Sequence, residues 1–366
     1  MRSVACAISL VLATVGCSGP DNSVLVAKDA SPSDGAGGSG GAMVDAPGAD
    51  APGADADAQP TDGGEDAFVP DAPPADSSFV ADGPSVFTFF HGIPNARAVR
   101  VCFEVQEGSS LVPLPVPPMP DGSLGLLYGS AFSAAGLDDV NLETQDVRPV
   151  VFVGALEKIA EDACDELDPP PEGVARVALE VIPAGSLARG RSVLMVASGC
   201  VAGPVDDPNA PVVCGADFTP SKGNASLLIA SMDRTYPSGA LGFQVFAGSR
   251  ATAAMGLDHV TAFPSMSNLL ASNLSPGKIA PRPPSTLLSV ANLGTTPEQN
   301  LLQVYGENAL TPSAVSLLTD ALARGGLSLD SLQDGKNYTV VVAGPSPTLE
   351  GSWFKAMVIT VISSDP

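Results

Sequence analysis

Positive charge and aromatic side chains are both scarce in this sequence. Its 366 residues include 17 Lys and Arg against 40 Asp and Glu, which gives a net charge of −23. Aromatic residues make up 5% of the chain. The shortage of cations excludes a nucleic-acid-binding protein, because nothing could neutralise phosphates along a groove. The 38 Gly and 35 Pro argue against long helices, since both residues break them.

The first 17 residues predict an export signal that ends in a lipid-modified cysteine. Arg2 precedes an apolar run at 4–15, which is too short to span a bilayer and typical of a signal peptide. Residues 14–17, Thr-Val-Gly-Cys, resemble the bacterial lipobox. We therefore expect lipidation of Cys17 and, because Ser18 rather than Asp follows it, attachment to the outer membrane. The alternative is an ordinary secretory signal that leaves Cys17 as a thiol.

Residues 18–84 predict an acidic stalk. The segment holds 13 acidic residues and one basic residue, and Asp-Ala-Pro-Gly-Ala occurs at both 45–49 and 50–54. It has too little apolar surface to offset the entropy lost on ordering, and proline and like charges favour extension. We expect a disordered tether that holds the rest of the chain away from the membrane.

From residue 85 onward, short β-type runs alternate with Gly, Pro, Asn and Asp, which is typical of strands joined by turns. The predicted strands are 86–90, 99–105, 150–153, 175–181, 193–197, 227–230, 241–246, 286–290, 301–305, 338–342 and 356–362. Alternation in 99–105 predicts one buried face and one wet face. Helical periodicity is convincing only at 314–324.

An internal repeat predicts how this β-rich part divides. Residues 86–90 match 226–230, and GRSVLMVASG at 190–199 matches GKNYTVVVAG at 335–344. A period of about 140 residues indicates tandem domains, which we place at 85–221 and 222–366. The expected fold is mainly β, with tandem immunoglobulin-like antiparallel β-sandwich domains after the stalk.

The start of this region resembles a known bacterial family. A strand ending in Phe90 and His91, the turn Pro94-Asn95-Ala96 and a strand opening Val99-Arg100-Val101 are similar to the family's opening "VVHASPDAPAVDVYV". The GKNYTVVVAG segment resembles the same family, domain of unknown function 4397. The resemblance covers most of 85–366 and implies extracytoplasmic β-sandwich domains without assigned biochemistry, here in a two-copy lipoprotein form of the myxobacterial type.

Four cysteines follow the predicted lipidation site, an even number for an exported protein. They are Cys102, Cys164, Cys200 and Cys214, and three pairings are possible. We favour Cys200–Cys214 and Cys102–Cys164, both inside the first domain. A zinc site is disfavoured because no Cys-x-x-Cys pair occurs. Reduction should therefore weaken the first domain and leave the second nearly untouched.

Catalytic motifs are scarce as well. We expect His91 to be a partly buried strand-end residue bonded to a backbone carbonyl, and His259 to lie in a solvated loop. No nucleophile elbow, phosphate loop or His-Glu-x-x-His motif occurs. The acidic pairs, interpreted as solvated loop faces, are Asp138-Asp139, Glu161-Asp162, Asp165-Glu166 and Asp206-Asp207. A weak calcium site at Asp206, Asp207 and Asn209 is the alternative. The sequence thus predicts no catalytic residue, no cofactor and no resident metal.

Together these features favour a non-catalytic lipoprotein of the cell envelope. Its predicted partners are the membrane, through the lipid anchor, and a protein, matrix or polysaccharide component of unknown identity. Two alternatives stay open. An extracytoplasmic hydrolase would need His91 or a carboxylate pair to line a concave pocket, and His91 exposed in a cleft and bonded to Ser or Asp would favour it. A purely structural envelope spacer would need no ligand.

Overall fold

The computed structural model describes the β-rich part of the chain from residue 86 to residue 365. The described residues are 86–116, 118–120, 125–135, 144–186, 192–203, 207–234, 240–249, 257–262, 268–286, 289–294, 296, 299–306, 309–345, 349 and 351–365. The predicted signal, Cys17 and the predicted stalk lie outside these residues, as do Asp138, Asp139 and Asp206.

The described part is mainly β, which confirms the predicted fold class. Its strands are β1 Val86–His91, β2 Ala98–Glu107, β3 Ser110–Pro113, β4 Leu126–Leu127, β5 Ala131–Ala135, β6 Val147–Gly154, β7 Val174–Ala178, β8 Ser192–Ser198, β9 Ser226–Met232, β10 Gly242–Ala247, β11 Leu257–Ala262, β12 Asn268–Leu274, β13 Ile279–Thr286, β14 Leu301–Gly306, β15 Ala314–Leu317, β16 Asn337–Ala343 and β17 Val358–Ser363. The helical segments are short: η1 Leu156–Ile159, η2 Cys164–Glu166, α1 Ala210–Cys214, η5 Val290–Asn292, α2 Leu318–Arg324 and η7 Leu329–Ser331.

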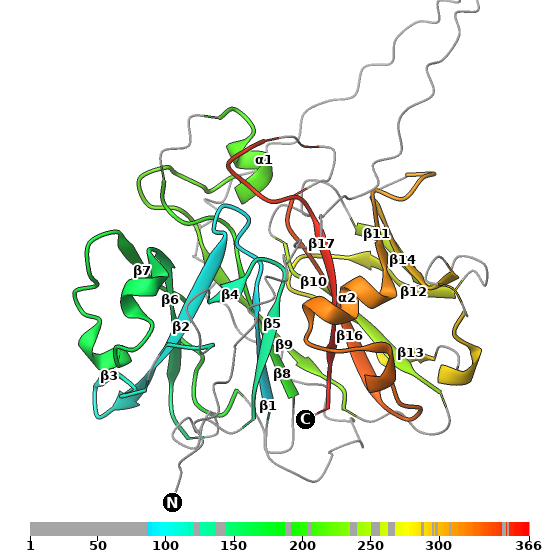
Figure 1. Ribbon diagram of the computed structural model, residues 1–366, viewed down its shortest axis with the longest axis horizontal. Helices are drawn as coiled ribbons and strands as arrows, with labels where there is room; N and C mark the ends of the chain where they lie inside the picture. The colour runs from blue at the N-terminus through cyan, green and yellow to red at the C-terminus, as the bar shows by residue number, and fades with distance from the viewer. Residues whose placement is uncertain are drawn as a thin grey trace, which may run out of the picture. The chain divides into compact units, whose positions relative to one another are not determined.

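These strands form four sheets, two in each half of the described chain. The first inner sheet has the order β5-β1-β8-β9, and the first outer sheet β3-β2-β6-β7, with β4 beside β2. The second inner sheet has the order β13-β10-β16-β17, and the second outer sheet β12-β11-β14-β15. Each inner sheet contains one parallel pair, β1 with β8 and β10 with β16, while the other pairings are antiparallel (Figure 1).

The two halves repeat the same topology, and the repeat begins later than the sequence suggests. The match between 190–199 and 335–344 aligns β8 with β16, as predicted. Residues 226–232, however, are β9, which pairs antiparallel with β8 and completes the first inner sheet. The second copy of β1 is β10, so the structural boundary falls between β9 and β10, beyond the predicted 221/222. A short apolar run does not reveal whether its strand opens or closes a repeat.

Each half is a β-sandwich with its own core. In the first half, side chains of β1 and β8 such as Phe89 and Met195 pack against Val101 and Val151 of the outer sheet. In the second half the core combines both sheets with α2, which lies against β17 (Figure 1). Alternate residues of each strand supply these cores, as the period of a β-strand requires.

The inner sheets also pack on each other through their opposite faces. This third core, which we call the seam, unites Phe90, Leu194 and Val196 with Phe246 and Val341. The four central strands are consequently buried at every position. Strands buried on both faces have nearly continuous apolar sequences, as these do. The halves therefore share a core, and the expectation that reduction would affect only one of them loses its basis.

Three local expectations are corrected. The predicted wet face of 99–105 is covered, because the segment of η1 and η2 packs over it and Cys102 joins Cys164 there. On that face the buried Glu104 carboxylate accepts hydrogen bonds from Arg148 (3.3 Å) and from Arg176. The predicted helix at 314–324 begins as β15 and becomes α2 only at Leu318. The described residues of 286–290 do not form the predicted strand. β13 ends at Thr286, and η5 begins at Val290.

Candidate functional site

The carboxyl ends of the central strands meet at one end of the two sandwiches. The Gly92 N–H donates to the Ala197 carbonyl at 2.8 Å, and the Lys355 N–H donates to the Pro94 carbonyl at 2.9 Å. The described parts of the segments after these strands, residues 92–97, 199–203, 207–225, 344–345, 349 and 351–357, are called here the carboxyl-end loops. They bring both halves of the chain to one surface.

The two favoured disulfides, Cys102–Cys164 and Cys200–Cys214, are both present. The second closes a carboxyl-end loop that contains α1. Asn224 fixes this loop, because its Oδ1 accepts from the Cys200 N–H and its Nδ2 donates to the Cys214 carbonyl, both at 2.9 Å. Phe354 of the second half packs on the same disulfide. The cross-linked loop is therefore part of the contact between halves.

Asp207 and Trp353 connect the same two loops by a hydrogen bond. Nε1–H of Trp353 donates to Asp207 Oδ2 at 2.6 Å, and the Asn209 N–H donates to Oδ1 at 2.8 Å. The bond from Trp353, with a smaller contribution from Asn209, lowers the pKa of Asp207. Both carboxylate oxygens are thus already engaged by protein donors. Among the described residues no group of three or more His, Cys, Asp or Glu side chains could hold a metal ion.

His91 lies at the end of β1 and is fully buried. Its Nε2–H donates to the Ala96 carbonyl at 3.0 Å, and its Nδ1 accepts from the Ile93 N–H at 3.3 Å. Burial lowers the pKa of His91 to about 3, although the bond to Ala96 opposes the shift. A neutral imidazole that fastens the turn after β1 accounts for all these contacts. Its bond to a backbone carbonyl is as predicted, but the ring is fully rather than partly buried.

The other predicted candidates do not gather around His91. His259 lies in β11, where its backbone pairs with Ser272 and Tyr305, and not in a loop. Among the acidic pairs, 161–162 and 165–166 belong to the segment over the first outer sheet. Within the described residues, the structure thus brings no predicted nucleophile, base and acid together.

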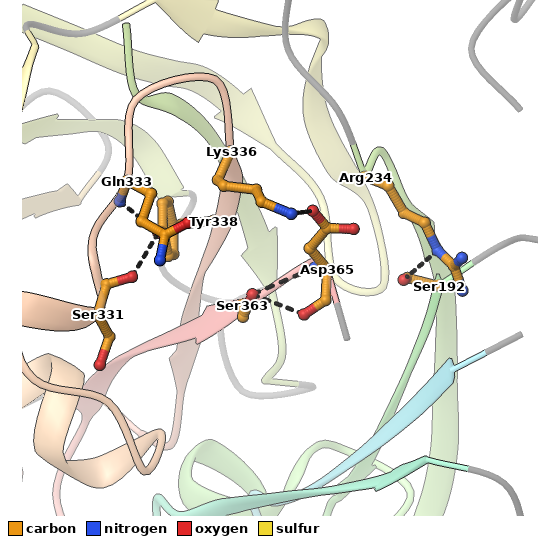
Figure 2. A network of polar contacts seen from close by, with 8 residues as sticks. All are labelled: Ser192, Arg234, Ser331, Gln333, Lys336, Tyr338, Ser363 and Asp365. Atoms are coloured by element: carbon orange, nitrogen blue, oxygen red, sulfur yellow. Dashed lines mark hydrogen bonds and ion pairs between the residues drawn. The ribbon is translucent and has the colours of Figure 1, made fainter. Parts of the chain in front are cut away.

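The amino end of the seam carries a cluster of buried polar side chains. The buried polar side chains on this face, called here the polar end of the seam, are Thr88, Ser192, Arg234, Gln244, Asn337, Thr339 and Ser364. Nε–H of Arg234 donates to Ser192 Oγ at 2.9 Å, while Lys336 forms an ion pair with Asp365 (Figure 2). Burial lowers the pKa of Arg234, and attraction to Asp365 opposes the shift.

Sequence reasoning missed the residues that join the two halves. Tyr128, which follows β4, donates from its hydroxyl to the Ala356 carbonyl at 3.1 Å, and its ring meets His91 edge-on at 5.8 Å. The Thr360 hydroxyl donates to the Gly129 carbonyl at 2.6 Å. These residues stand in no motif. Their only signal is that Tyr and Trp are rare in the chain, with four and one respectively.

Comparison with protein-family models found no match, and comparison with curated proteins found no relative. Within the described part of the chain no helix has the length and apolar character needed to cross a bilayer.

Proposed function

We propose that this chain is a lipoprotein of the outer membrane, held by lipid on Cys17, whose double sandwich makes non-catalytic contacts with a protein, matrix or envelope polymer. The observation that carries the proposal is Thr-Val-Gly-Cys at 14–17, directly after a short apolar run. The acidic segment 18–84 supplies a spacer of net charge −12, from 13 acidic residues and one basic. The resemblance to domain of unknown function 4397 suggests the same class of extracytoplasmic protein.

The direction of the strands favours the carboxyl-end loops as the contact surface. The segment that precedes β1 joins it at Val86, the amino end of the strand, whereas the loops follow the carboxyl ends. The loops and Val86 therefore lie at opposite ends of the first inner sheet. Val212 of α1 is 39% exposed there, and loops held by a rigid scaffold commonly carry binding function.

The bonding of the polar candidates supports a scaffold rather than an enzyme. Both ring nitrogens of His91 are bonded to backbone groups, and both oxygens of Asp207 are bonded to protein donors. A general base needs a free lone pair within reach of its substrate, and His91, buried with both ring nitrogens bonded, has none. Their present contacts instead rigidify the surface that the strands display.

Anchoring is tested by Cys17→Ser in the full chain. The expected result is a shift of the protein from the membrane fraction to the soluble fraction and loss of labelling by a palmitate analogue. Ser18→Ala is the matched control, since it alters the adjacent residue and should leave both readouts unchanged. Unaltered membrane partitioning of the Cys17→Ser chain would contradict the lipid anchor.

Contact is tested with the released Cys17→Ser chain and isolated envelope and extracellular matrix fractions. Val212→Asp on a carboxyl-end loop should lower the amount retained several-fold. Leu269→Asp, at a position 52% exposed in the second outer sheet, should bind like the parent. Equal loss in both variants would argue against the loops. Absence of retention by any fraction would favour the structural spacer.

A further inference from the structure

Asn337 is buried at the polar end of the seam with its amide group unpaired. Its exposure is 0%, and neither Nδ2 nor Oδ1 has a hydrogen-bond partner among the described residues. A buried amide without partners is costly, because folding removes the hydrogen bonds that it made to water. Such groups are rare in folded proteins, and each needs a physical reason.

The residues beside Asn337 across the second inner sheet are small or polar. Gly242 of β10 stands next to it in parallel register and has no side chain. On the other side the Ser364 N–H donates to the Asn337 carbonyl at 3.0 Å. The hydroxyls of Ser364 and Thr339 are bonded to each other at 2.9 Å, within the buried region. One bond between two hydroxyls leaves one O–H donor and further lone pairs for another partner.

In the first half, the buried polar side chain at the corresponding position is hydrogen-bonded by another side chain. Ser192 opens β8 as Asn337 opens β16, and Met232 pairs with Ser192 as Ser364 lies beside Asn337. Two residues beyond Met232, Arg234 folds back and donates to Ser192 Oγ (Figure 2). The corresponding position in the second half is Pro366, whose side chain has no hydrogen-bond donor.

We propose that Asn337 binds an ordered water molecule at the polar end of the seam. The water accepts a hydrogen bond from Nδ2 and donates one to Oδ1 or to the Ser364–Thr339 hydroxyl pair. Buried waters of this kind make about three hydrogen bonds to polar groups that the chain leaves unpaired, and they are part of the structure. This water would hydrogen-bond the buried side chain of Asn337, as the Arg234 guanidinium hydrogen-bonds Ser192 in the first half.

A high-resolution crystal structure of the full chain tests this site. The expected result is a single well-ordered peak of water size about 2.9 Å from Asn337 Nδ2 or Oδ1. No peak within hydrogen-bond distance of the amide would overturn the proposal. So would a larger solute or a metal ion, identified by its density and coordination distances.

Two variants test whether the Asn337 amide holds the water that gives this peak. Asn337→Leu keeps a similar shape without polar atoms, and the peak should disappear from its structure. Ser192→Ala, the matched change in the first half, should leave the peak at Asn337 in place. Persistence of the peak in Asn337→Leu would show that other groups hold it and would overturn the assignment. If Asn337→Leu does not fold, the parent structure alone still decides whether water is bound.

Discussion

The Tyr128 hydroxyl of the first half donates to the Ala356 carbonyl of the second half at 3.1 Å. Tyr128 is preceded by β4, and Ala356 lies just before β17, so the bond joins segments 228 residues apart. Burial raises the pKa of Tyr128, and the hydroxyl therefore keeps the proton that it donates. This one side chain touches both the turn of His91 and the loop that leads into β17.

Tyr128→Phe should destabilise the whole double sandwich. It removes the donor and leaves the Ala356 carbonyl without this partner, which costs about 1–2 kcal/mol. Chemical denaturation followed by circular dichroism measures the loss. Tyr305→Phe is the matched control, because that hydroxyl bonds Gln303 on its own strand and its removal should cost clearly less. Equal losses would show that the bond between the halves stabilises the fold no more than a bond within one strand does.

Gly344→Ala should be among the most damaging single changes. Gly344 has φ 96°, and an added Cβ would lie 2.1 Å from the Tyr128 hydroxyl oxygen. Backbone strain and the clash together should cost about 3 kcal/mol or more. Gly326→Ala isolates the strain, because its φ is +75° and nothing lies within 4 Å of the added Cβ. That control should lose only about 1 kcal/mol.

The double variant Tyr128→Phe with Gly344→Ala locates the clash. Removal of the hydroxyl oxygen makes room for the new methyl group, so the two losses should sum to more than the measured loss of the pair. Strict additivity would place the damage of Gly344→Ala in the backbone alone.

The sequence predicts the strands that form short apolar runs, because such a run must be buried on at least one face. It misses others, such as β3, β5, β11 and β12. It predicts the disulfides because loop closure and export leave few sensible pairings. The sequence does not predict that the two inner sheets pack on each other at the seam. The runs in β8 and β16 are continuously apolar, a pattern that indicates burial on both faces but does not identify the covering element. Tyr128 and Trp353 could not be assigned either, since their partners are backbone or carboxylate atoms on the other half.

Loss of the Cys200–Cys214 disulfide should lower the stability of both halves. The bridge closes a loop of sequence separation 14, and Cys200→Ser with Cys214→Ser should cost about 3 kcal/mol in the chain-entropy view. Because the halves share the seam, fluorescence of Trp353 and circular dichroism should report one common transition, shifted to lower denaturant. Trp353 is the only tryptophan in the chain and bonds Asp207, so its fluorescence reports the contact between the second half and the disulfide loop.

The matched control for that variant is Cys102→Ser with Cys164→Ser, which removes the bridge over the first outer sheet. It should also lower stability, yet it leaves the contact between Trp353 and the disulfide loop intact in the folded state. Separate transitions by the two probes in either variant would argue for independent halves.

His91 should make the protein less stable as the pH falls. Its pKa is about 3 in the folded chain, whereas an ordinary exposed imidazole, as in the unfolded chain, has a pKa of 6.5. Between these values the unfolded state binds a proton that the folded state does not, so stability drops by about 1.4 kcal/mol for each pH unit as the pH falls. Well above pH 6.5 the effect is absent, because His91 is neutral in both states.

His91→Gln removes this titration while it keeps a hydrogen-bonding side chain at the turn. From pH 7 to pH 4.5, the parent should lose about 2.5 kcal/mol more of its free energy of unfolding than the variant does. Urea denaturation at each pH measures both curves, and pH dependence common to both arises from carboxylates. Parallel curves would mean that His91 gains a proton in the folded state at an ordinary pH, which its burial and its bond from the Ile93 N–H to Nδ1 oppose.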